Sequence, residues 1–404
     1  MLFLVATAAA ADWLLLQGTE PGPDPVAVRP WGFVQALGEG IPFGEPVVGL
    51  TSESLAAFEG ERASFNRVGS GDATWGISLR RARAGLRGAV PKTGGKVAWL
   101  LAAEFGDNGL TRVDPVVLTD ASVTFSYLPG ARIRVGQFKL PLGEEALEMN
   151  PLAAEFVNFS AATGQLLLEN PSADGAYTAG ASGFRDLGVQ VFDTFAVGPG
   201  TVSYAVMLSN GRMGALELDD SKDITARLAW APWVGGEPDA PHRDEVGVYG
   251  FWQQGERMVD GEAVARVRRG GGAQVEKAGW HARVEVIQGS GAIEGGANPP
   301  FPGQPVVVAA EGQALGGYAY LHYERGLLGG GLRYDELWRR YDSPADLRVF
   351  RTVTADVQVE ITPRARLMLD YELRWLAAPE GSTDAQAIAA TLGDRVSLQA
   401  AVVF

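Results

Sequence analysis

The sequence predicts an all-β protein, a transmembrane antiparallel β-barrel of about 16 strands. From Trp75 onward, apolar and polar residues alternate in runs of roughly 9 to 14 residues, the length that a tilted strand needs to cross a bilayer. Tight connections rich in Pro and Gly alternate with long ones. No segment after the N-terminus holds about 20 consecutive apolar residues, and a membrane protein without helical spans must be a barrel.

Composition excludes several partners and chemistries. The net charge of -14 argues against nucleic acid, because phosphate binding needs a clustered positive face. Without cysteine there is no disulfide framework, no thiolate metal site and no cysteine nucleophile. A hydrophobic fraction of 46% suits a soluble α/β enzyme or a barrel, but 53 glycines and runs rich in Val, Tyr, Phe, Trp and Thr favour all-β.

The N-terminal residues, 1–30, lie before the expected barrel. Residues 1–11, MLFLVATAAAA, are typical of the apolar core and Ala-x-Ala end of a secretory signal peptide. The charged region that opens such a signal is missing, so an apolar N-terminal arm is the alternative. Residues 12–30 carry four prolines and two glycines and predict a periplasmic arm or linker. The barrel is expected to span residues 31–404.

Taken in order, the expected strands are 29–37, 75–90, 96–105, 115–128, 131–139, 184–197, 200–209, 222–231, 244–254, 262–269, 278–288, 313–325, 326–337, 348–361, 364–375 and 394–404. An even number is what a bacterial barrel with both termini in the periplasm requires. Connections 232–243 and 270–277 are longer than expected for the periplasmic side, where turns are tight. The number of strands around 244–288 is therefore uncertain by two.

Because side chains alternate across a strand, one face of each strand meets lipid and the other meets the lumen. Sixteen or so strands enclose a lumen too wide for side chains to fill, so we expect the polar face inside. The expected basic wall comprises Arg81, Arg83, Arg87, Arg132, Arg134, Arg227, Arg266, Arg268, Arg283, Arg333 and Arg366. Such a wall binds phosphate or carboxylate. Cross-strand pairing with the acids Asp120, Glu285, Asp335, Asp356 and Glu360 is the alternative, and both stay open.

The stretch from Arg132 to Glu148 joins an arginine-bearing strand to an acidic, helix-prone segment. It leads into the longest connection between strands, which we interpret as a constriction inside the lumen. The residues assigned to this constriction are Lys139, Glu144, Glu145, Glu148 and Glu155. We expect the first three glutamates to face Arg132 and Arg134 across the narrowest gap. The resulting transverse field would favour polar or zwitterionic solutes.

The chain ends in a run whose apolar residues share one face and whose last residue is Phe404. This pattern resembles the C-terminal strand by which the assembly machinery recognises outer-membrane barrels. A buried C-terminal strand of a soluble sandwich is the alternative.

Two motifs resemble the phosphate-selective porin family, the O and P porins: RRARAGLRG at 80–88 and RVGQFKLPLGE at 134–144. The resemblance covers residues 75–150. It implies a homotrimeric porin of the bacterial outer membrane, a water-filled channel for passive diffusion of small hydrophilic solutes, including anions such as phosphate. It also implies that the third extracellular loop folds inward and that lumenal arginines and lysines bind the anion. Outer-membrane lipid and lipopolysaccharide are the expected surroundings.

A plugged structural barrel and a barrel-embedded enzyme are the alternatives to a diffusion channel. An embedded hydrolase would need a lipid-facing serine near a histidine. His242, His281 and His322 are too far apart in sequence to form a recognisable metal pair. We therefore expect no enzyme activity, no metal and no cofactor.

Overall fold

The computed structural model describes residues 26–68, 72–106, 116–149, 151–168, 170–171, 177–178, 184–211, 220–235, 243–295, 301, 304 and 307–404. The expected signal peptide at 1–11 and most of the arm at 12–30 lie outside these residues. Among the described residues, no helix is both long and apolar enough to cross a bilayer.

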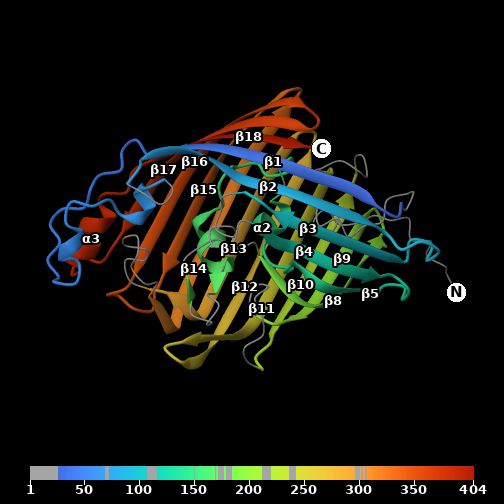
Figure 1. Ribbon diagram of the computed structural model, residues 1–404, viewed down its shortest axis with the longest axis horizontal. Coiled ribbons are helices and arrows are strands. Elements are labelled where there is room, and N and C mark those ends of the chain that lie inside the picture. The colour runs from blue at the N-terminus through green and yellow to red at the C-terminus, as the bar shows by residue number, and fades with distance from the viewer. Residues whose placement is uncertain are drawn as a thin grey trace.

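Sixteen antiparallel strands close into one barrel (Figure 1). They are β1 (Arg29–Gly40), β2 (Trp75–Ala89), β3 (Val97–Glu104), β4 (Val117–Phe125), β5 (Arg132–Lys139), β8 (Arg185–Val197), β9 (Gly200–Ser209), β10 (Asp223–Val234), β11 (Glu245–Val259), β12 (Glu262–Lys277), β13 (Trp280–Glu294), β14 (Val308–Arg325), β15 (Leu328–Arg339), β16 (Arg348–Thr362), β17 (Ala365–Ala377) and β18 (Arg395–Val403). Each strand pairs with its neighbours in the chain, and β18 pairs with β1. A two-stranded sheet of β6 (Asn170–Pro171) and β7 (Tyr177–Thr178) is separate.

The expected strands correspond one to one with the observed barrel strands, which fixes the count at sixteen. The largest error concerns 270–277, which was expected to be a connection and instead continues β12. Gly270 and Gly272 pair with Phe251 and Tyr249 on β11, and a Cβ at either glycine would collide with the opposite ring. The glycines therefore make room for two inward-facing aromatic rings within a regular strand.

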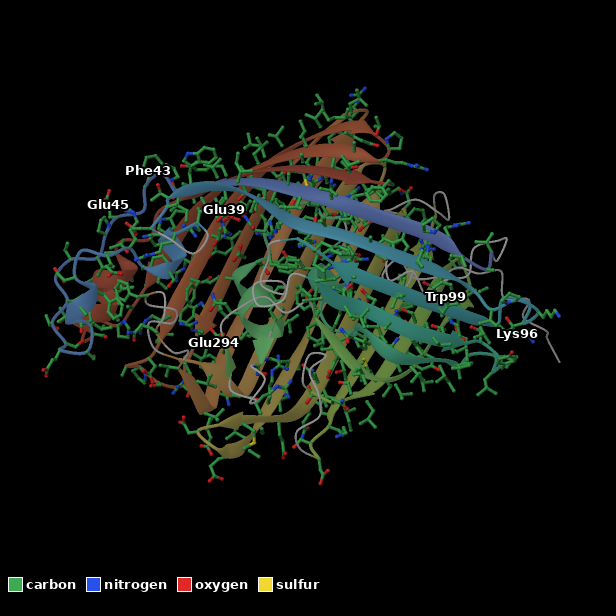
Figure 2. The ribbon with its side chains drawn as sticks, viewed as in Figure 1. Glu39, Phe43, Glu45, Lys96, Trp99 and Glu294 are labelled. Carbon is green, nitrogen blue, oxygen red and sulfur yellow. The ribbon has the colours of Figure 1, made fainter. Side chains whose placement is uncertain are left out.

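The connections separate the two ends of the barrel. Tight turns at 198–199, 278–279, 326–327 and 363–364 lie at one end, the tight-connection end. Long connections, including 41–74 and 378–394, lie at the other, the long-connection end. Figure 2 shows Phe43 and Glu45 at the long-connection end and Lys96 and Trp99 at the opposite one.

At the long-connection end the connections form a small core of their own. Phe58 stacks on Phe301 with ring centroids 4.6 Å apart, and Val47 and Ala63 pack beside Ile388 of helix α3 (Thr383–Ala389). This packing joins connections that are far apart in sequence.

The two faces of the strands differ in polarity as expected. On β17, Leu369 and Leu373 point outward with 46% and 39% of their surface exposed, while Asp370 and Glu372 point inward and are buried. Large apolar side chains are exposed on the outer face of every part of the barrel. A continuous apolar outer face is what a bilayer requires of a barrel.

A β-bulge changes the face of one arginine. Gln35 and Ala36 on β1 are consecutive, but their partners on β2 are Arg81 and Leu79, so Arg80 is the extra residue. A bulge places two neighbouring residues against one partner and shifts the alternation. Arg80 and Arg81 are therefore both available to the interior.

The barrel closes where the last residue meets the first strand. Gly32 donates a backbone hydrogen bond to Phe404 at 3.0 Å and accepts one from Phe404 at 2.9 Å. The Phe404 ring covers Gly32, where a Cβ would stand 2.6 Å from the ring. The aromatic ring thus fills the space that the glycine leaves at the seam.

Candidate functional site

The chain between β5 and β8 enters the interior of the barrel. Residues 140–149 and 151–168 of it are called the inner segment; they contain helix α2 (Glu144–Glu148) and the π-helical turn η3 (Thr163–Leu167). Figure 1 shows α2 within the ring of strands.

Carboxylates on the inner wall accept hydrogen bonds from the backbone of the inner segment. The N–H of Glu144 donates to Glu285 on β13 at 2.8 Å, and the N–H of Val157 donates to Asp370 on β17 at 2.8 Å. A third, from Ala161, reaches Asp335 on β15 at 2.9 Å. Irregular backbone leaves N–H groups without ladder partners, and these carboxylates supply the acceptors.

One side of the inner segment is apolar and packs on an apolar part of the wall. Leu140, Leu142, Leu166 and Leu167 form one buried cluster with inward residues of β9 to β15. The wall contributes Met207, Tyr249, Phe251, Ile287, Ile293, Ala314 and Leu337. The expectation that the polar face of each strand lies inside was wrong for this part, because a segment that lies against the wall excludes water from it.

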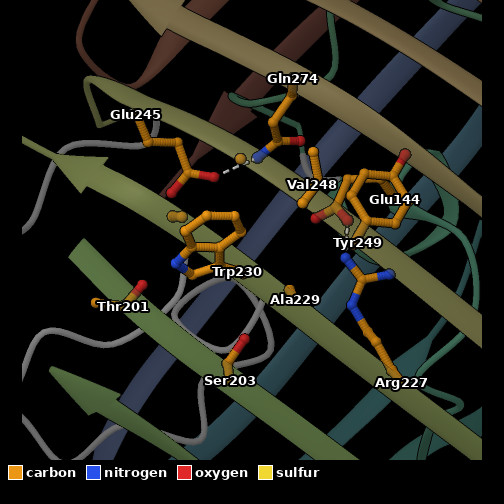
Figure 3. A pocket seen from close by; sticks show the side chains of 12 residues that line it. Glu144, Thr201, Ser203, Arg227, Ala229, Trp230, Glu245, Val248, Tyr249 and Gln274 are labelled. Atoms are coloured by element: carbon orange, nitrogen blue, oxygen red, sulfur yellow. Dashed lines mark hydrogen bonds and ion pairs between the residues drawn. The ribbon is translucent and has the colours of Figure 1, made fainter. Parts of the chain in front are cut away.

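The acidic residues of α2 and its flank pair with arginines of the wall. Glu144 accepts from Arg227 on β10, as Figure 3 shows. Glu148 accepts from Arg283 on β13.

Glu145 accepts from Arg333 on β15 at 2.9 Å. All three arginines are at least 96% buried, so each pair removes two charges from water together.

These pairs correct the expected constriction. Glu144, Glu145 and Glu148 were expected to face Arg132 and Arg134 across the narrowest gap. They are instead turned toward β10, β13 and β15. The strand that carries the two arginines precedes the inner segment directly, but the arginines that neutralise the acids come from strands much later in the chain.

Guanidinium groups also bind backbone oxygens of the inner segment. The carbonyl of Leu166, in the π-helical turn, accepts from Arg266 at 3.0 Å and from Arg268 at 2.8 Å. Arg366 on β17 donates to the carbonyl of Ala154 at 2.5 Å. Carbonyls at the end of a helical turn lack intrahelical donors, and arginine supplies charged ones.

Lys139 at the end of β5 also binds backbone carbonyls, in this case those of α2. Its Nζ donates to the carbonyls of Ala146 at 3.2 Å and Leu147 at 2.8 Å. A cation at the C-terminal end of a helical turn is favoured by the dipole of its carbonyls. Glu155, the remaining residue of the expected constriction, has Oε1 3.3 Å from Nδ1 of His281.

The ion pairs of α2 lie with strands β10 to β15, whereas Leu147 packs on Phe192 of β8 and Ala205 of β9. A basic cluster lies on the opposite arc, on strands β2, β5 and β8. This basic cluster consists of Arg80, Arg81, Arg83, Arg134, Lys139 and Arg185. Arg83 pairs with Glu104 at 2.8 Å and Arg185 with Asp120 at 3.0 Å. No described residue forms an ion pair with Arg81, whose electrostatic neighbours include Arg80, Arg83, Arg185 and Glu104. Arg80 has the carboxylates Glu39, Asp370 and Glu372 among its electrostatic neighbours.

Two further expected residues lie closer to the tight-connection end. Arg132 pairs with Asp193 at 3.1 Å and lies over the ring of Phe192, with its Cζ 4.6 Å from the ring centroid. Arg87 is the register partner of Arg29 on β1. The structure thus divides the expected basic wall into arginines that hold the inner segment and arginines on the opposite arc.

Sequence reasoning missed Arg80, Arg185 and the tyrosines around Glu285. Tyr249 and Tyr318 donate to Glu285 Oε2 at 2.7 Å and 3.0 Å. The alternation of inward positions on β11 and β14 was the available signal for both tyrosines. Arg185 and Asp186 are both charged and open a strand, so the alternation of polarity does not show which of the two side chains points inward.

Cavities lie on both sides of the inner segment. One of about 320 Å³, toward the tight-connection end, is lined by Leu152, His281, Glu324 and Arg366 among others. One of about 240 Å³, toward the long-connection end, is lined by Phe159, Arg333 and Arg374 among others. Space therefore remains within the barrel beside the inner segment.

Comparison with solved structures shows the same fold in outer-membrane proteins. The chain superposes on OmpF of Salmonella typhi in complex with daunomycin with a TM-score of 0.61 at 10% identity, covering 93% of this chain and 97% of that one. For the outer-membrane channel DcaP of Acinetobacter baumannii the TM-score is 0.57 at 12% identity, with 95% and 99% covered. For OmpT of Vibrio cholerae in its trimer form it is 0.51 at 12% identity, with 94% and 100% covered. No model of a protein family matches the sequence, and no curated protein matches it.

Proposed function

We propose that this protein is an outer-membrane porin, a passive diffusion channel for small hydrophilic solutes in which anions are favoured. The observation that carries the proposal is the separation of charge within the barrel. The acids of the inner segment are paired with arginines of the β10–β15 arc, whereas on the opposite arc no described residue forms an ion pair with Arg81, whose electrostatic neighbours include Arg80, Arg83 and Arg185.

We propose that the path for solute passes Arg81 and its neighbours in the basic cluster. A charged wall raises the local concentration of the opposite ion, and the low-dielectric surroundings strengthen its field. Arg81 is the residue of this wall that we expect to contribute most, because no described carboxylate pairs with it. Phosphate and small carboxylates are the solutes that guanidinium groups bind best.

Liposome swelling tests the channel itself. Liposomes that contain the folded protein are expected to swell in small sugars. The swelling rate is expected to fall as the sugar becomes larger, because an aqueous path of fixed width sieves by size. A variant that lacks residues 144–167 provides a control for incorporation and is expected to swell faster. If liposomes with the shortened chain swell and those with the natural chain do not, the natural barrel is plugged and the channel proposal is wrong.

The plugged structural barrel is the second candidate, and one observation favours it. The apolar cluster between the inner segment and the wall is continuous from Phe138 to Leu337. The inner segment also reaches the opposite arc, where Leu147 packs on Phe192 of β8 and Ala205 of β9. A segment held on both sides by such contacts and by several buried ion pairs would close the barrel.

The proposal includes assembly and location. OmpT of Vibrio cholerae is described in a trimer form, and we propose a homotrimer for this chain, to be tested by light scattering in detergent. The apolar outer face supports placement in the outer membrane, surrounded by lipid and lipopolysaccharide. β1 begins and β18 ends at the tight-connection end, which we propose to be periplasmic. Phe404 would then be the residue that the assembly machinery recognises.

A further inference from the structure

We propose that His281, His322 and Glu324 form a binding site for a divalent transition-metal ion such as Zn²⁺. The two histidines are far apart in sequence but are direct register partners on the adjacent strands β13 and β14. Their ring centroids lie 5.9 Å apart, and both side chains are buried inside the barrel. Glu324 follows His322 by two positions and so faces the same side. One ligand atom from each of the three residues lies within 4.8 Å of the other two.

A carboxylate stands behind each histidine. Nδ1 of His281 lies 3.3 Å from Oε1 of Glu155, and Nε2 of His322 lies 3.2 Å from Oδ1 of Asp356. Metal-binding histidines generally give their other ring N–H to such a carboxylate, which fixes the tautomer and makes the free nitrogen more basic. On His322 the other nitrogen, Nδ1, lies 3.9 Å from Oε1 of Glu324.

The ligand types select the class of metal. Two imidazole nitrogens and one carboxylate oxygen suit zinc, copper or nickel, whereas calcium and magnesium prefer oxygen ligands. Ligand atoms around a tetrahedral zinc ion with bonds of about 2.0 to 2.2 Å lie about 3.5 Å apart. The three ligand atoms, now within 4.8 Å of one another, would therefore move closer together on binding the ion.

The cluster is reached from the cavity of about 320 Å³, which His281 and Glu324 line. Three protein ligands leave a fourth position that water or a solute molecule takes. Around this cavity the acids Asp244, Glu276 and Glu360 stand against the cations Arg243, Lys277 and Arg366. The charges around the cavity therefore balance and do not oppose the binding of a cation.

Metal binding would also act on the inner segment, since Glu155 belongs to it. An ion that orients His281 strengthens the pair between His281 and Glu155, and with it the attachment of the inner segment to β13. The site thus lies where a bound ion can tighten the position of the inner segment.

Calorimetric titration with Zn²⁺ alone tests the proposal, on the full chain folded in detergent and stripped with a chelator. The natural chain is expected to bind one ion per chain with micromolar or tighter affinity. His281→Ala and His322→Ala are expected to abolish this binding, and Asp356→Asn to weaken it by about 10- to 100-fold. Glu256→Gln on β11 is the control, because Glu256 does not line this cavity, and it is expected to change nothing.

Gel mobility before and after heating shows whether each variant forms the barrel. Should a histidine variant fail to fold, Glu324→Gln is the second test, because its shape is unchanged and its side chain is 42% exposed. This variant is expected to lose most of the affinity. A natural chain that binds no zinc, or folded His322→Ala or Glu324→Gln variants that bind it as tightly as the natural chain, would overturn the proposal.

Discussion

Arg333 on β15 donates one hydrogen bond to Glu145 at 2.9 Å and another to the backbone oxygen of Asn158 at 2.8 Å. The ring of Phe156 lies against the same guanidinium group, its centroid 4.8 Å from Cζ. One side chain therefore joins helix α2 to the later part of the inner segment and fixes both to the wall. The Arg333 side chain is 2% exposed and that of Glu145 12%, so neither charge has much water to replace its partner.

Arg333→Ala is expected to lower the free energy of unfolding by about 3–5 kcal/mol, because it leaves Glu145 buried without its partner. Urea unfolding of the protein in lipid vesicles, followed by tryptophan fluorescence, measures this change.

Glu61→Ala is the control for that variant. Glu61 pairs with Arg67 at 3.1 Å in the 41–74 connection, and its side chain is 48% exposed. Exposed pairs contribute about 0–1 kcal/mol, so the control is expected to change little. Equal losses in the two variants would show that Arg333 does not hold the inner segment.

Leu166→Ala tests the apolar attachment of the inner segment. Leu166 is 1% exposed within the buried cluster that joins the segment to the wall. The substitution is expected to cost about 2–5 kcal/mol through lost burial and the cavity left behind. Leu398→Ala, on the outer face where Leu398 is 52% exposed, is the control and is expected to cost less. The same unfolding measurement ranks the two, and the reverse order would contradict the packing described here.

The strands and their faces followed from the sequence, but the partners of the inner segment did not. Alternation is a local property, so β17 was placed with its inward and outward residues correct. The pairing of Glu145 with Arg333 depends on how an irregular segment crosses the lumen, and no local pattern records that path. The glycines of β12 resembled a loop because the rings of Phe251 and Tyr249 that cover them lie on another strand.

Two features of the interior escaped the sequence for similar reasons. The bulge at Arg80 breaks the alternation by a single residue within a run of arginines, where polarity gives no sign of it. His281 and His322 were judged too distant in sequence to form a pair, yet the register of β13 against β14 sets them opposite each other. Register is determined by the turn between strands and by packing, neither of which spacing alone reveals.

The seam of the barrel gives a prediction for assembly. Gly32→Ala is expected to slow folding into vesicles and reduce the folded fraction, because its Cβ would meet the Phe404 ring and the backbone oxygen of Arg83 at 2.9 Å. Gly38→Ala on the same strand is the control, since its Cβ would meet only a backbone oxygen at 3.9 Å. The heat-modifiable shift in gel mobility, sampled during refolding, measures both. Equal rates would remove the Gly32–Phe404 contact as a determinant of closure.

The long connections give a prediction for acid. The Ser52 and Thr51 hydrogen bonds to the Asp384 carboxylate lower the pKa of that group to about 2. A lowered pKa means that the carboxylate contributes stability above the unfolded value, about 4, and loses it as the pH falls toward 2. The protection of the Thr51 and Ser52 amides against hydrogen exchange, relative to the intrinsic rate at each pH, is expected to fall between pH 4 and 2. Asp384→Asn is expected to reduce this protection already at neutral pH. Protection that changes with neither the pH nor the substitution would show that Asp384 does not hold these two amides.

The reversal potential of the channel in a potassium chloride gradient tests the central claim most directly. Planar bilayers containing the natural chain are expected to show a reversal potential of the sign set by chloride, since Arg81 on β2 has no ion-pair partner among the described residues. Arg81→Gln is expected to move that potential toward zero and Arg81→Glu to move it further, with the barrel intact. A natural channel that prefers potassium, or one whose potential does not respond to either change at Arg81, would contradict the account.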